Sequence, residues 1–308
     1  MLIKNFNKIL NKILNKILNK IFKEDIEKTK ILSGKNLLNN QTIKNSNNLN
    51  DYEASIFSQW GEDGIINYLI NIIKPKEKTF LEFGVDNYDE SNTRFLLFNK
   101  NWSGHIIDGS KKNIDYIKQS YYYWKYDINA YCKFIDCENI NDFLKSKIKK
   151  KLSLLSLDID GNDYWVLKEL DLNYFNPEIL ICEYNSLLGS KYALTTPYDK
   201  NFTRSKKDYL YYGASIQAFT KLCKKKGFFL VGSNLNGNNL FFVRDDFRNK
   251  FEEKNPEQVF QYSKFRESRD KEGNLTFKNY EQNQKIISSY EFYNLETEKK
   301  VIFKDLKI

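Results

Sequence analysis

The sequence has a single histidine among its 308 residues, and this scarcity restricts the chemistry open to the chain. His105 lies inside an apolar run that we interpret as a strand. Ser-His-Asp and Cys-His arrangements and histidine-ligated metal centres therefore have no good candidate residue. Any reaction has to rest on carboxylates, tyrosine, lysine, asparagine or a bound cofactor.

Cysteine and long apolar runs are also scarce. The spacing of the four cysteines, Cys132, Cys137, Cys182 and Cys223, fits no zinc pattern, and three of them lie in apolar or strand-like runs. We interpret them as reduced thiols in a cytoplasmic protein. No apolar run is long enough to span a membrane, and the first residues do not form the apolar core of a signal peptide.

Positive charge is concentrated at one end of the chain. The formal net charge is +9, and residues 1–50 hold ten lysines and three acids, which is +7 of that total. The remainder is close to neutral and has no basic footprint, so we expect no nucleic-acid partner. A hydrophobic content of 41% is sufficient for a substantial core.

The amino-terminal segment contains a four-residue repeat. Asn-Lys-Ile-Leu occurs at 7–10, 11–14 and 15–18, and closes as Asn-Lys-Ile-Phe at 19–22. This spacing predicts a basic amphipathic helix over residues 5–22, whose apolar stripe drifts by about 40° per repeat, which disfavours a coiled coil. It fits contact with the anionic inner face of a membrane, a docking helix for a partner, or a low-complexity extension. Residues 33–50 are Asn-, Lys- and Ser-rich and are interpreted as a linker.

Strands and helices alternate through the middle of the chain. Apolar runs predict strands at 79–85, 104–108, 133–136, 154–160 and 178–183. A helix over 215–226 and a predicted hairpin of strands 228–231 and 240–244 follow. The pattern indicates a three-layer α/β fold with a mostly parallel sheet whose last strand is antiparallel. We assign residues 1–50 to the amino-terminal helix and linker, 51–250 to the main domain, and 251–308 to a charged extension with a small hairpin.

Polar residues gather where these strands end, which is where open parallel sheets bind ligands. They are Glu82, Gly84 and Asp86 after the first strand, Asp108 and Ser110 after the second, Asp136, Glu138 and Asn139 after the third, Asp158, Asp160, Asn162 and Asp163 after the fourth, and Glu183 and Asn185 after the fifth. So many carboxylates on one edge repel one another unless a cationic ligand, a metal or an arginine neutralises them.

The densest group of acids follows the fourth strand. Asp158 and Asp160 fall on the same face of that strand, and oxygen ligands grouped in this way suit Mg²⁺ or another divalent cation. One of Asn162 and Asp163 instead fits the cap of the following helix. An Asp-x-Asp pair is equally a feature of metal-dependent nucleotide-sugar glycosyltransferases, so that class remains an alternative.

Several segments taken in order resemble a known family. They are 58–63 (Ser-Gln-Trp-Gly-Glu-Asp), 80–84 (Phe-Leu-Glu-Phe-Gly), 157–164 (Leu-Asp-Ile-Asp-Gly-Asn-Asp-Tyr), 183–185 (Glu-Tyr-Asn), 212–215 (Tyr-Gly-Ala-Ser) and 239–246 (Asn-Leu-Phe-Phe-Val-Arg-Asp-Asp). Residues 52–246 thereby resemble the FkbM-like branch of class I S-adenosylmethionine-dependent methyltransferases. The resemblance implies a Rossmann-like sheet of seven strands with the last antiparallel. It also implies O-methyl transfer, often to a sugar of a bacterial surface glycan or a related metabolite.

The resemblance implies roles for particular residues. Glu82, Gly84 and Asp86 would line the methionine side of the cofactor, and Asp108 would bind its ribose. Asp136, or Glu138 with Asn139, would lie near the adenine. Asp158, Asp160, Glu183 and Asn185 look like the acids and amide of metal-dependent O-methyltransferases. We expect Asp158 or Asp160 to accept the proton of the acceptor hydroxyl. The chain departs from the family pattern where Val85-Asp86-Asn87 replaces a second glycine.

The segment 186–213 is rich in tyrosine and carries Arg204, Lys206 and Lys207, which suits a sugar or glycan-precursor substrate with acidic substituents. A non-catalytic Rossmann-like scaffold docked through its amino-terminal helix is the other alternative. No sequence feature indicates an oligomeric state.

Overall fold

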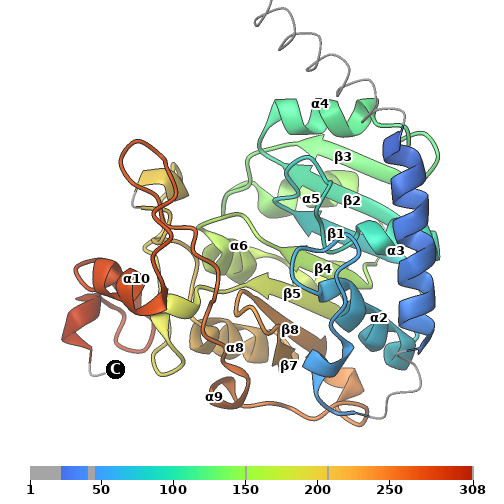
Figure 1. Ribbon diagram of the computed structural model, residues 1–308. Helices are drawn as coiled ribbons and strands as arrows, with labels where there is room; N and C mark the ends of the chain where they lie inside the picture. The colour runs from blue at the N-terminus through green and yellow to red at the C-terminus, as the bar shows by residue number, and fades with distance from the viewer. Residues whose placement is uncertain (1–21, 41–45, 150, 207, 307–308) are drawn as a thin grey trace, which may run out of the picture.

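The protein is built around one seven-stranded sheet with the strand order β3-β2-β1-β4-β5-β8-β7 (Figure 1). The computed structural model describes residues 22–40, 46–149, 151–206 and 208–306. Six strands run parallel, and β8 is antiparallel to both of its neighbours. The predicted Rossmann-like sheet of seven strands, mostly parallel with the last one antiparallel, is confirmed. Its strands are β1 Thr79–Phe83, β2 Ser103–Asp108, β3 Ile128–Cys132, β4 Leu154–Leu157, β5 Ile179–Glu183, β7 Phe228–Ser233 and β8 Asn239–Arg244.

The central strands are buried on both faces, and β1 shows how. All five of its residues are buried. Because successive side chains alternate, Phe80 packs into the hydrophobic core on one side of the sheet, while Leu81 and Phe83 pack into the core on the other side. Strands covered on both faces are continuous apolar runs in the sequence, which is why β1, β4 and β5 were predictable.

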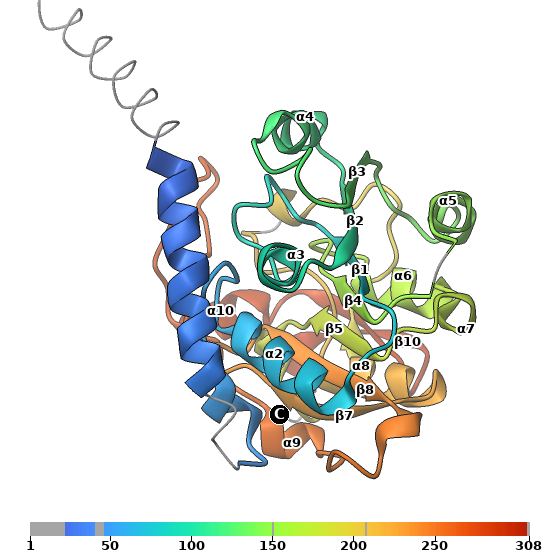
Figure 2. The ribbon, with the colours of Figure 1, turned by 90° about the vertical axis from the view of Figure 1, so that its right-hand side faces the viewer.

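Helices cover both faces of the sheet (Figure 2). One side carries α2 Glu62–Ile73, α3 Arg94–Lys100 and α4 Lys111–Gln119, and the other carries α5 Ile140–Lys147, α6 Asp163–Glu169, α7 Leu172–Phe175 and α8 Ile216–Lys225. Each helix contributes a buried apolar stripe to the core beneath it, as an amphipathic surface helix does. The expected three layers result.

The third strand is misplaced in the prediction. β3 occupies Ile128–Cys132, so the strand predicted at 133–136 is wrong. β3 lies at the edge of the sheet, and only Ile128 and Ala130 are buried in it, so it lacks the apolar run that marks a central strand. Phe134 and Ile135, the apolar pair behind the prediction, lie in the loop that follows.

The amino-terminal segment forms a helix over residues 22–40 that packs against the α2–α3 side of the domain (Figures 1 and 2). Leu38 is buried there, and a Cβ atom on Gly34 would lie 2.6 Å from the side chain of Ile56. The prediction of a linker is therefore wrong for residues 33–40. Of the predicted helix over residues 5–22, all but Phe22 lies outside the described residues. No helix in the described ranges is long and apolar enough to cross a membrane.

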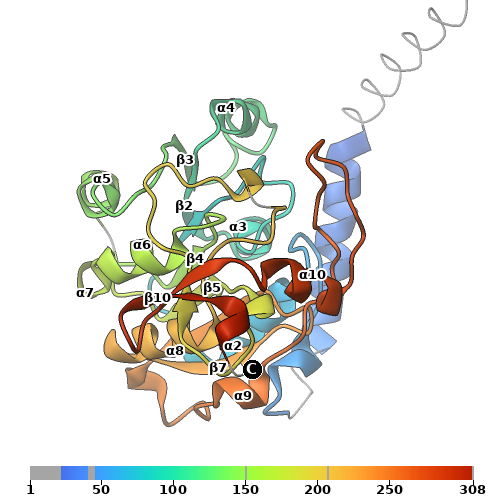
Figure 3. The ribbon, with the colours of Figure 1, turned by 90° about the vertical axis from the view of Figure 1, so that its left-hand side faces the viewer.

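The C-terminal segment packs on the long insertion that follows β5 (Figure 3). A small sheet has the order β10-β9-β6 and joins β9 and β10, at the place of the expected hairpin, to the insertion strand β6. Its strands are β6 Leu194–Thr195, β9 Glu291–Asn294 and β10 Lys299–Ile302, with α9 Pro256–Val259 and α10 Tyr280–Ile287 ahead of the hairpin. Leu187, Leu194, Phe292 and Phe303 share a separate hydrophobic core beneath it.

Candidate active site

A cavity of about 510 Å³ lies at the carboxyl ends of β1, β2 and β4. The chain leaves β1 toward β2 on one side and reaches β4 on the other, and such a switch in strand order is where open α/β sheets bind ligands. The cavity is lined by Phe83, Gly84, Asp86, Ile107, Asp108, Gly109, Ser110, Asn113, Lys133, Phe134, Ile135, Asp158, Ile159, Asp160, Asn162 and Phe202. Seven of the fourteen residues predicted at the strand ends are among them.

Gly84 lets the turn after β1 approach the turn after β4. Its φ is 66°, in the left-handed region that favours glycine. A Cβ atom at this position would lie 1.7 Å from the carbonyl oxygen of Asp158. The cavity floor therefore requires glycine at this position for both conformation and space.

Asp108 is the fixed carboxylate of the cavity wall. One of its oxygens accepts hydrogen bonds from the backbone N–H of Ser110 (2.7 Å) and the amide of Asn113 (3.3 Å), and the other accepts from the N–H of Asp86 (2.9 Å). Ser110 in turn caps α4 through the N–H of Asn113. These contacts leave lone pairs on Asp108 for a ligand hydroxyl.

Asp86 carries a second carboxylate into the cavity. Its φ is 46°, and the amide of Asn113 donates to its side chain at 3.3 Å. Burial raises the pKa of Asp86, and repulsion from Asp108 and Asp160 raises it further. A bound cation would relieve that repulsion.

Glu82 does not line the cavity, so its predicted place beside the cofactor is corrected. It is buried beneath the cavity and accepts hydrogen bonds from the hydroxyl of Ser91 (2.7 Å), the N–H of Asn92 (2.8 Å), and both the N–H and hydroxyl of Thr93. Burial raises the pKa of Glu82, and the bonds from Thr93 and Ser91 oppose that shift. Its role is to hold the loop before α3.

Asp136 and Asn139 also lie outside the cavity wall. Their side chains cap each other's backbone: Asn139 N–H donates to Asp136 at 2.8 Å, and Asp136 N–H donates to Asn139 at 3.3 Å. Because β3 ends at Cys132, the residues that follow its end are instead Lys133, Phe134 and Ile135. The misplaced strand concealed these lining residues, because it put Phe134 and Ile135 inside a strand and not in the loop after one.

The structure brings together three predicted acids: Asp158, Asp160 and Glu183. Each offers a carboxylate oxygen, and these oxygens lie within 4.8 Å of one another. Burial raises the pKa of Asp158 and of Glu183 well above the usual range. Repulsion from Asp160 raises both pKa values further, and repulsion from Asp158 also raises that of Glu183. One oxygen of Glu183 is buried and has no hydrogen-bond partner among the described residues. An unpartnered buried acceptor beside two acids can bind a cation or a proton.

Asn185 does not belong to this cluster, which corrects its prediction as a ligand. The side chain is fully buried, and its amide donates to the carbonyl oxygens of Leu210 (3.0 Å) and Tyr212 (3.2 Å). Its oxygen accepts from the N–H of Leu187 at 3.1 Å. The residue therefore holds the insertion onto the end of β5.

Arg204 is the cation that accompanies the acids. Its guanidinium donates to Asp160 and to Glu267, each at 2.5 Å, and stacks 3.6 Å from the ring centre of Tyr212. A third hydrogen bond reaches the carbonyl oxygen of Tyr209 at 2.9 Å. The sequence indicated that the acids need a counterion. No feature of the sequence indicated that Glu267 pairs with Arg204.

Asp163 fixes the turn that holds the acids. Its two oxygens accept the N–H groups of Ile159 (2.7 Å) and Gly161 (2.8 Å). Burial raises the pKa of Asp163 to about 6 although these hydrogen bonds oppose the shift. Asn162 ties the same turn to the insertion by donating to the carbonyl oxygen of Asp199 at 2.8 Å.

The sequence of this domain matches the family model of the methyltransferase FkbM domain over residues 65–199. Residues 65–199 are an FkbM methyltransferase domain. This match supports the S-adenosylmethionine-dependent methyl transfer that the resemblance implied. The match ends before the insertion is complete, so Arg204 and Glu267 lie outside it.

Solved methyltransferase structures resemble the FkbM domain and its surroundings at low identity. The N-terminal domain of EvdMO1 with SAH bound has 9% identity and a TM-score of 0.40, over 59% of this chain and 80% of that one. An O-methyltransferase from Bacillus cereus in complex with SAH has 10% identity and a TM-score of 0.40, over 70% and 91%. No curated protein matches the sequence. The fold assignment rests on the strand order itself.

Proposed function

We propose that this FkbM methyltransferase transfers the methyl group of S-adenosylmethionine to a sugar hydroxyl, in a bacterial surface glycan or a related metabolite. The observation that carries the proposal is the cavity at the switch in strand order, with a carboxylate cluster at one end. The methyl donor would occupy the cavity, and the acceptor hydroxyl would approach from the side of Asp158 and Glu183. We expect this reaction in the cytoplasm.

The charge and shape of the cavity support the methyl donor as its ligand. Asp86, Asp108, Asp158 and Asp160 line it, and Lys133 is the one cation among its described lining residues. An acidic wall complements a ligand that carries a sulfonium and an ammonium group. Phe134 and its apolar neighbours suit a flat purine ring, and the cavity volume falls within the usual range for small-molecule sites.

The proposed division of labour follows from the positions of the acids. Asp108 would accept the ribose hydroxyls, because its carboxylate is already fixed by backbone N–H groups. When bound, S-adenosylmethionine supplies an activated methyl group, and the chain supplies positioning and proton transfer. Asp158 would take the acceptor proton, since a carboxyl with a raised pKa is a stronger base than an exposed one.

A divalent cation is compatible with part of the predicted ligand set. Asp158, Asp160 and Glu183 offer the oxygen ligands that Mg²⁺ prefers, and the unpartnered oxygen of Glu183 faces no other donor among the described residues. Asn185 drops out of the set because its side chain is fully engaged. Arg204 competes for Asp160, so a cation would replace that ion pair.

Calorimetry distinguishes this function from the alternatives. We expect S-adenosylhomocysteine to bind the full chain, and uridine and guanosine diphosphate not to bind, with or without Mg²⁺. The glycosyltransferase alternative predicts the opposite pattern, and a non-catalytic scaffold predicts binding of neither. Binding of a nucleotide diphosphate alone would overturn the proposal.

Asp158→Asn tests the assigned base. Loss of a positioned base typically slows turnover about 10²- to 10⁴-fold, and we expect that loss here with the affinity for S-adenosylhomocysteine within about threefold. Asp136→Asn is the matched control, because Asp136 lies in the loop after the edge strand β3 and does not line the cavity. Full activity of the Asp158 variant in a methyl-transfer assay contradicts the assignment.

A further inference from the structure

We propose that Lys23 and Glu27 of the amino-terminal helix are positioning residues for the methyl-donor side of the active site. They hold the loop 86–93, which carries Asp86 into the cavity. The proposal rests on the function proposed above. It assigns to a segment outside the FkbM match a part in cofactor binding.

Arg94, the first residue of α3, is the centre of the contact between helix and loop. Its side chain is 1% exposed, and its guanidinium pairs with Glu27 at 2.8 Å and with the side chain of Asp89 at 3.2 Å. It also donates to the carbonyl oxygen of Asp89 at 2.9 Å. The rings of Phe57, Tyr88, Phe98 and Tyr122 surround it. A charge buried this deeply needs its counterions, and one of them comes from the amino-terminal helix.

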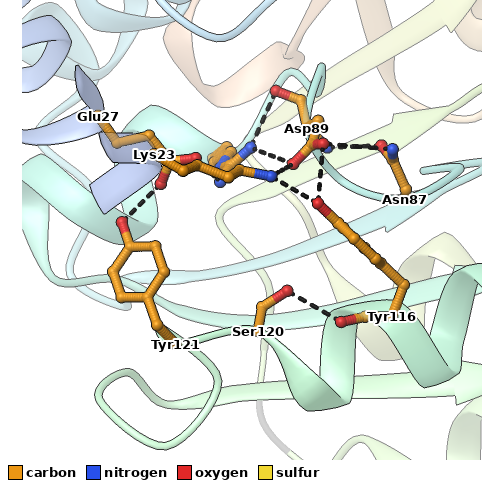
Figure 4. A network of polar contacts seen from close by, with 8 residues as sticks. Lys23, Glu27, Asn87, Asp89, Tyr116, Ser120 and Tyr121 are labelled. Atoms are coloured by element: carbon orange, nitrogen blue, oxygen red, sulfur yellow. Dashed lines mark hydrogen bonds and ion pairs between the residues drawn. The ribbon is translucent and has the colours of Figure 1, made fainter. Parts of the chain in front are cut away.

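The helix makes a second set of contacts with the same loop (Figure 4). Lys23 donates to Asp89 at 2.7 Å and to the hydroxyl of Tyr116 at 2.6 Å, and Tyr116 donates to the other oxygen of Asp89 at 3.2 Å. Glu27 accepts the hydroxyl of Tyr121 at 2.5 Å. Asp89 is thus held by residues of three separate elements.

The loop that Asp89 belongs to is both strained and functional. Asp86 and Tyr88 have φ values of 46° and 63°, which non-glycine residues adopt only when the surrounding structure holds them. Asn87 accepts the N–H of Asp89 at 2.9 Å, which links Asp89 back toward Asp86. The end of the loop is fixed independently, because Ser91 and its two successors bind Glu82.

Lys23 and Glu27 therefore fix the half of the loop that Glu82 does not reach. Without them, Asp89 and Arg94 lose partners, and the left-handed turn at residues 86–88 loses its outer support. Asp86 would then reach its position in the cavity for a smaller fraction of the time, and a smaller competent fraction weakens the observed affinity in proportion.

The test compares two lysines on the same helix. Lys23→Met removes the contacts to Asp89 and Tyr116, whereas Lys28→Met removes only pairs with Glu24 and Asp25 of the same helix. Calorimetry with S-adenosylhomocysteine on the full chain should show Kd raised about 3- to 10-fold in the first variant and within about twofold in the second, in the range typical of coupling through packed networks. Glu27→Gln should raise Kd about tenfold or more. Lys23→Arg, which keeps the positive charge, should retain wild-type affinity.

The steady-state signature separates positioning from folding. We expect the KM for S-adenosylmethionine to rise in the Lys23 variant while kcat at saturation stays near wild type. A lowered melting temperature with an unchanged Kd in both the Lys23 and Glu27 variants overturns the proposal and leaves the proposed function standing. Equal Kd values for Lys23→Met and Lys28→Met overturn it as well. Failure of the wild type to bind S-adenosylhomocysteine overturns the proposed function itself.

Discussion

Asp63 is a buried carboxylate that fixes the loop ahead of α2. One of its oxygens accepts the backbone N–H groups of Ile56, Phe57 and Ser58 at 2.7–2.8 Å. The other oxygen is buried and has no hydrogen-bond partner in the part of the chain that the structure describes. Burial raises the pKa of Asp63 to about 6 in spite of these hydrogen bonds. Asp63 lies in the first turn of α2 and reaches back to the loop before it.

The raised pKa of Asp63 makes stability depend on pH. In the unfolded chain this carboxyl has the ordinary pKa of 3.8, so the folded state binds its proton more tightly. The resulting stabilisation is fully present below pH 3.8 and is lost as pH rises through about 6. Between pH 5 and pH 7.5 this loss amounts to about 1.4 kcal/mol. Asp63→Asn should not show this loss. The unfolding free energy of the variant minus that of the wild type should therefore be higher at pH 7.5 than at pH 5, by about 1.4 kcal/mol.

Urea unfolding at the two pH values measures this effect. Asp25→Asn is the control, because the side chain of Asp25 is 72% exposed and the variant should follow the pH profile of the wild type. Parallel pH profiles for Asp63→Asn and wild type would show that the buried oxygen of Asp63 does not carry the effect.

At the scale of elements, burial decided what the sequence could predict. β1, β4 and β5 are buried on both faces and were found from apolar runs alone, whereas the half-exposed edge strand β3 was misplaced. The helix over residues 22–40 was missed in part because Asn- and Ser-rich composition hid the few residues that pack.

The site was predictable as an edge of the sheet but not side chain by side chain. Polar residues at strand ends either face the ligand or serve nearby backbone groups, and Glu82 and Asn185 do the second. The ion pairs of Arg204 join residues 44 and 63 positions apart, with no local pattern to reveal them. The predicted strand ends located the acids. The alternation argument was wrong for Asp158 and Asp160, because β4 ends at Leu157 and both acids lie in the turn that follows, where Asp160 has a φ of 58°.

The turn after β1, which contains Gly84 and lines the cavity, gives a prediction about stability and binding. Gly84→Ala places a Cβ atom against the backbone of Asp158, so we expect a loss of stability of about 3 kcal/mol or more and loss of S-adenosylhomocysteine binding. Gly213→Ala is a close control, because Gly213 also has a positive φ, 58°, but nothing lies within 4 Å of its added Cβ. We expect that variant to lose only about 1–2 kcal/mol. Similar losses in urea unfolding for both variants would contradict the close approach.

For the whole molecule, the amino-terminal segment divides into two parts with separate expected roles. Residues 22–40 pack on the domain, whereas residues 1–21 hold five lysines and the repeat that we propose to contact an anionic membrane surface or a partner. Basic residues near an anionic bilayer contribute about 1 kcal/mol each. Removing residues 1–21 should therefore weaken binding to phosphatidylserine-containing vesicles at least about tenfold.

The same deletion should leave the affinity for S-adenosylhomocysteine within about twofold, because Lys23 and Glu27 remain in place. Vesicles of neutral lipid are the control in a co-sedimentation assay. Unchanged binding of the shortened chain to anionic vesicles would assign any membrane contact to another surface.

The small sheet β10-β9-β6 has a consequence for how the chain matures during synthesis. All seven strands of the main sheet have been made once the chain passes Arg244, so the cofactor cavity can form on the ribosome before translation ends. Arg204 cannot meet Glu267, and β6 cannot pair with β9, until the last part of the chain emerges. The acid cluster therefore acquires its counterion last, and a nascent or prematurely terminated chain would capture the methyl donor before it could complete the site beside it.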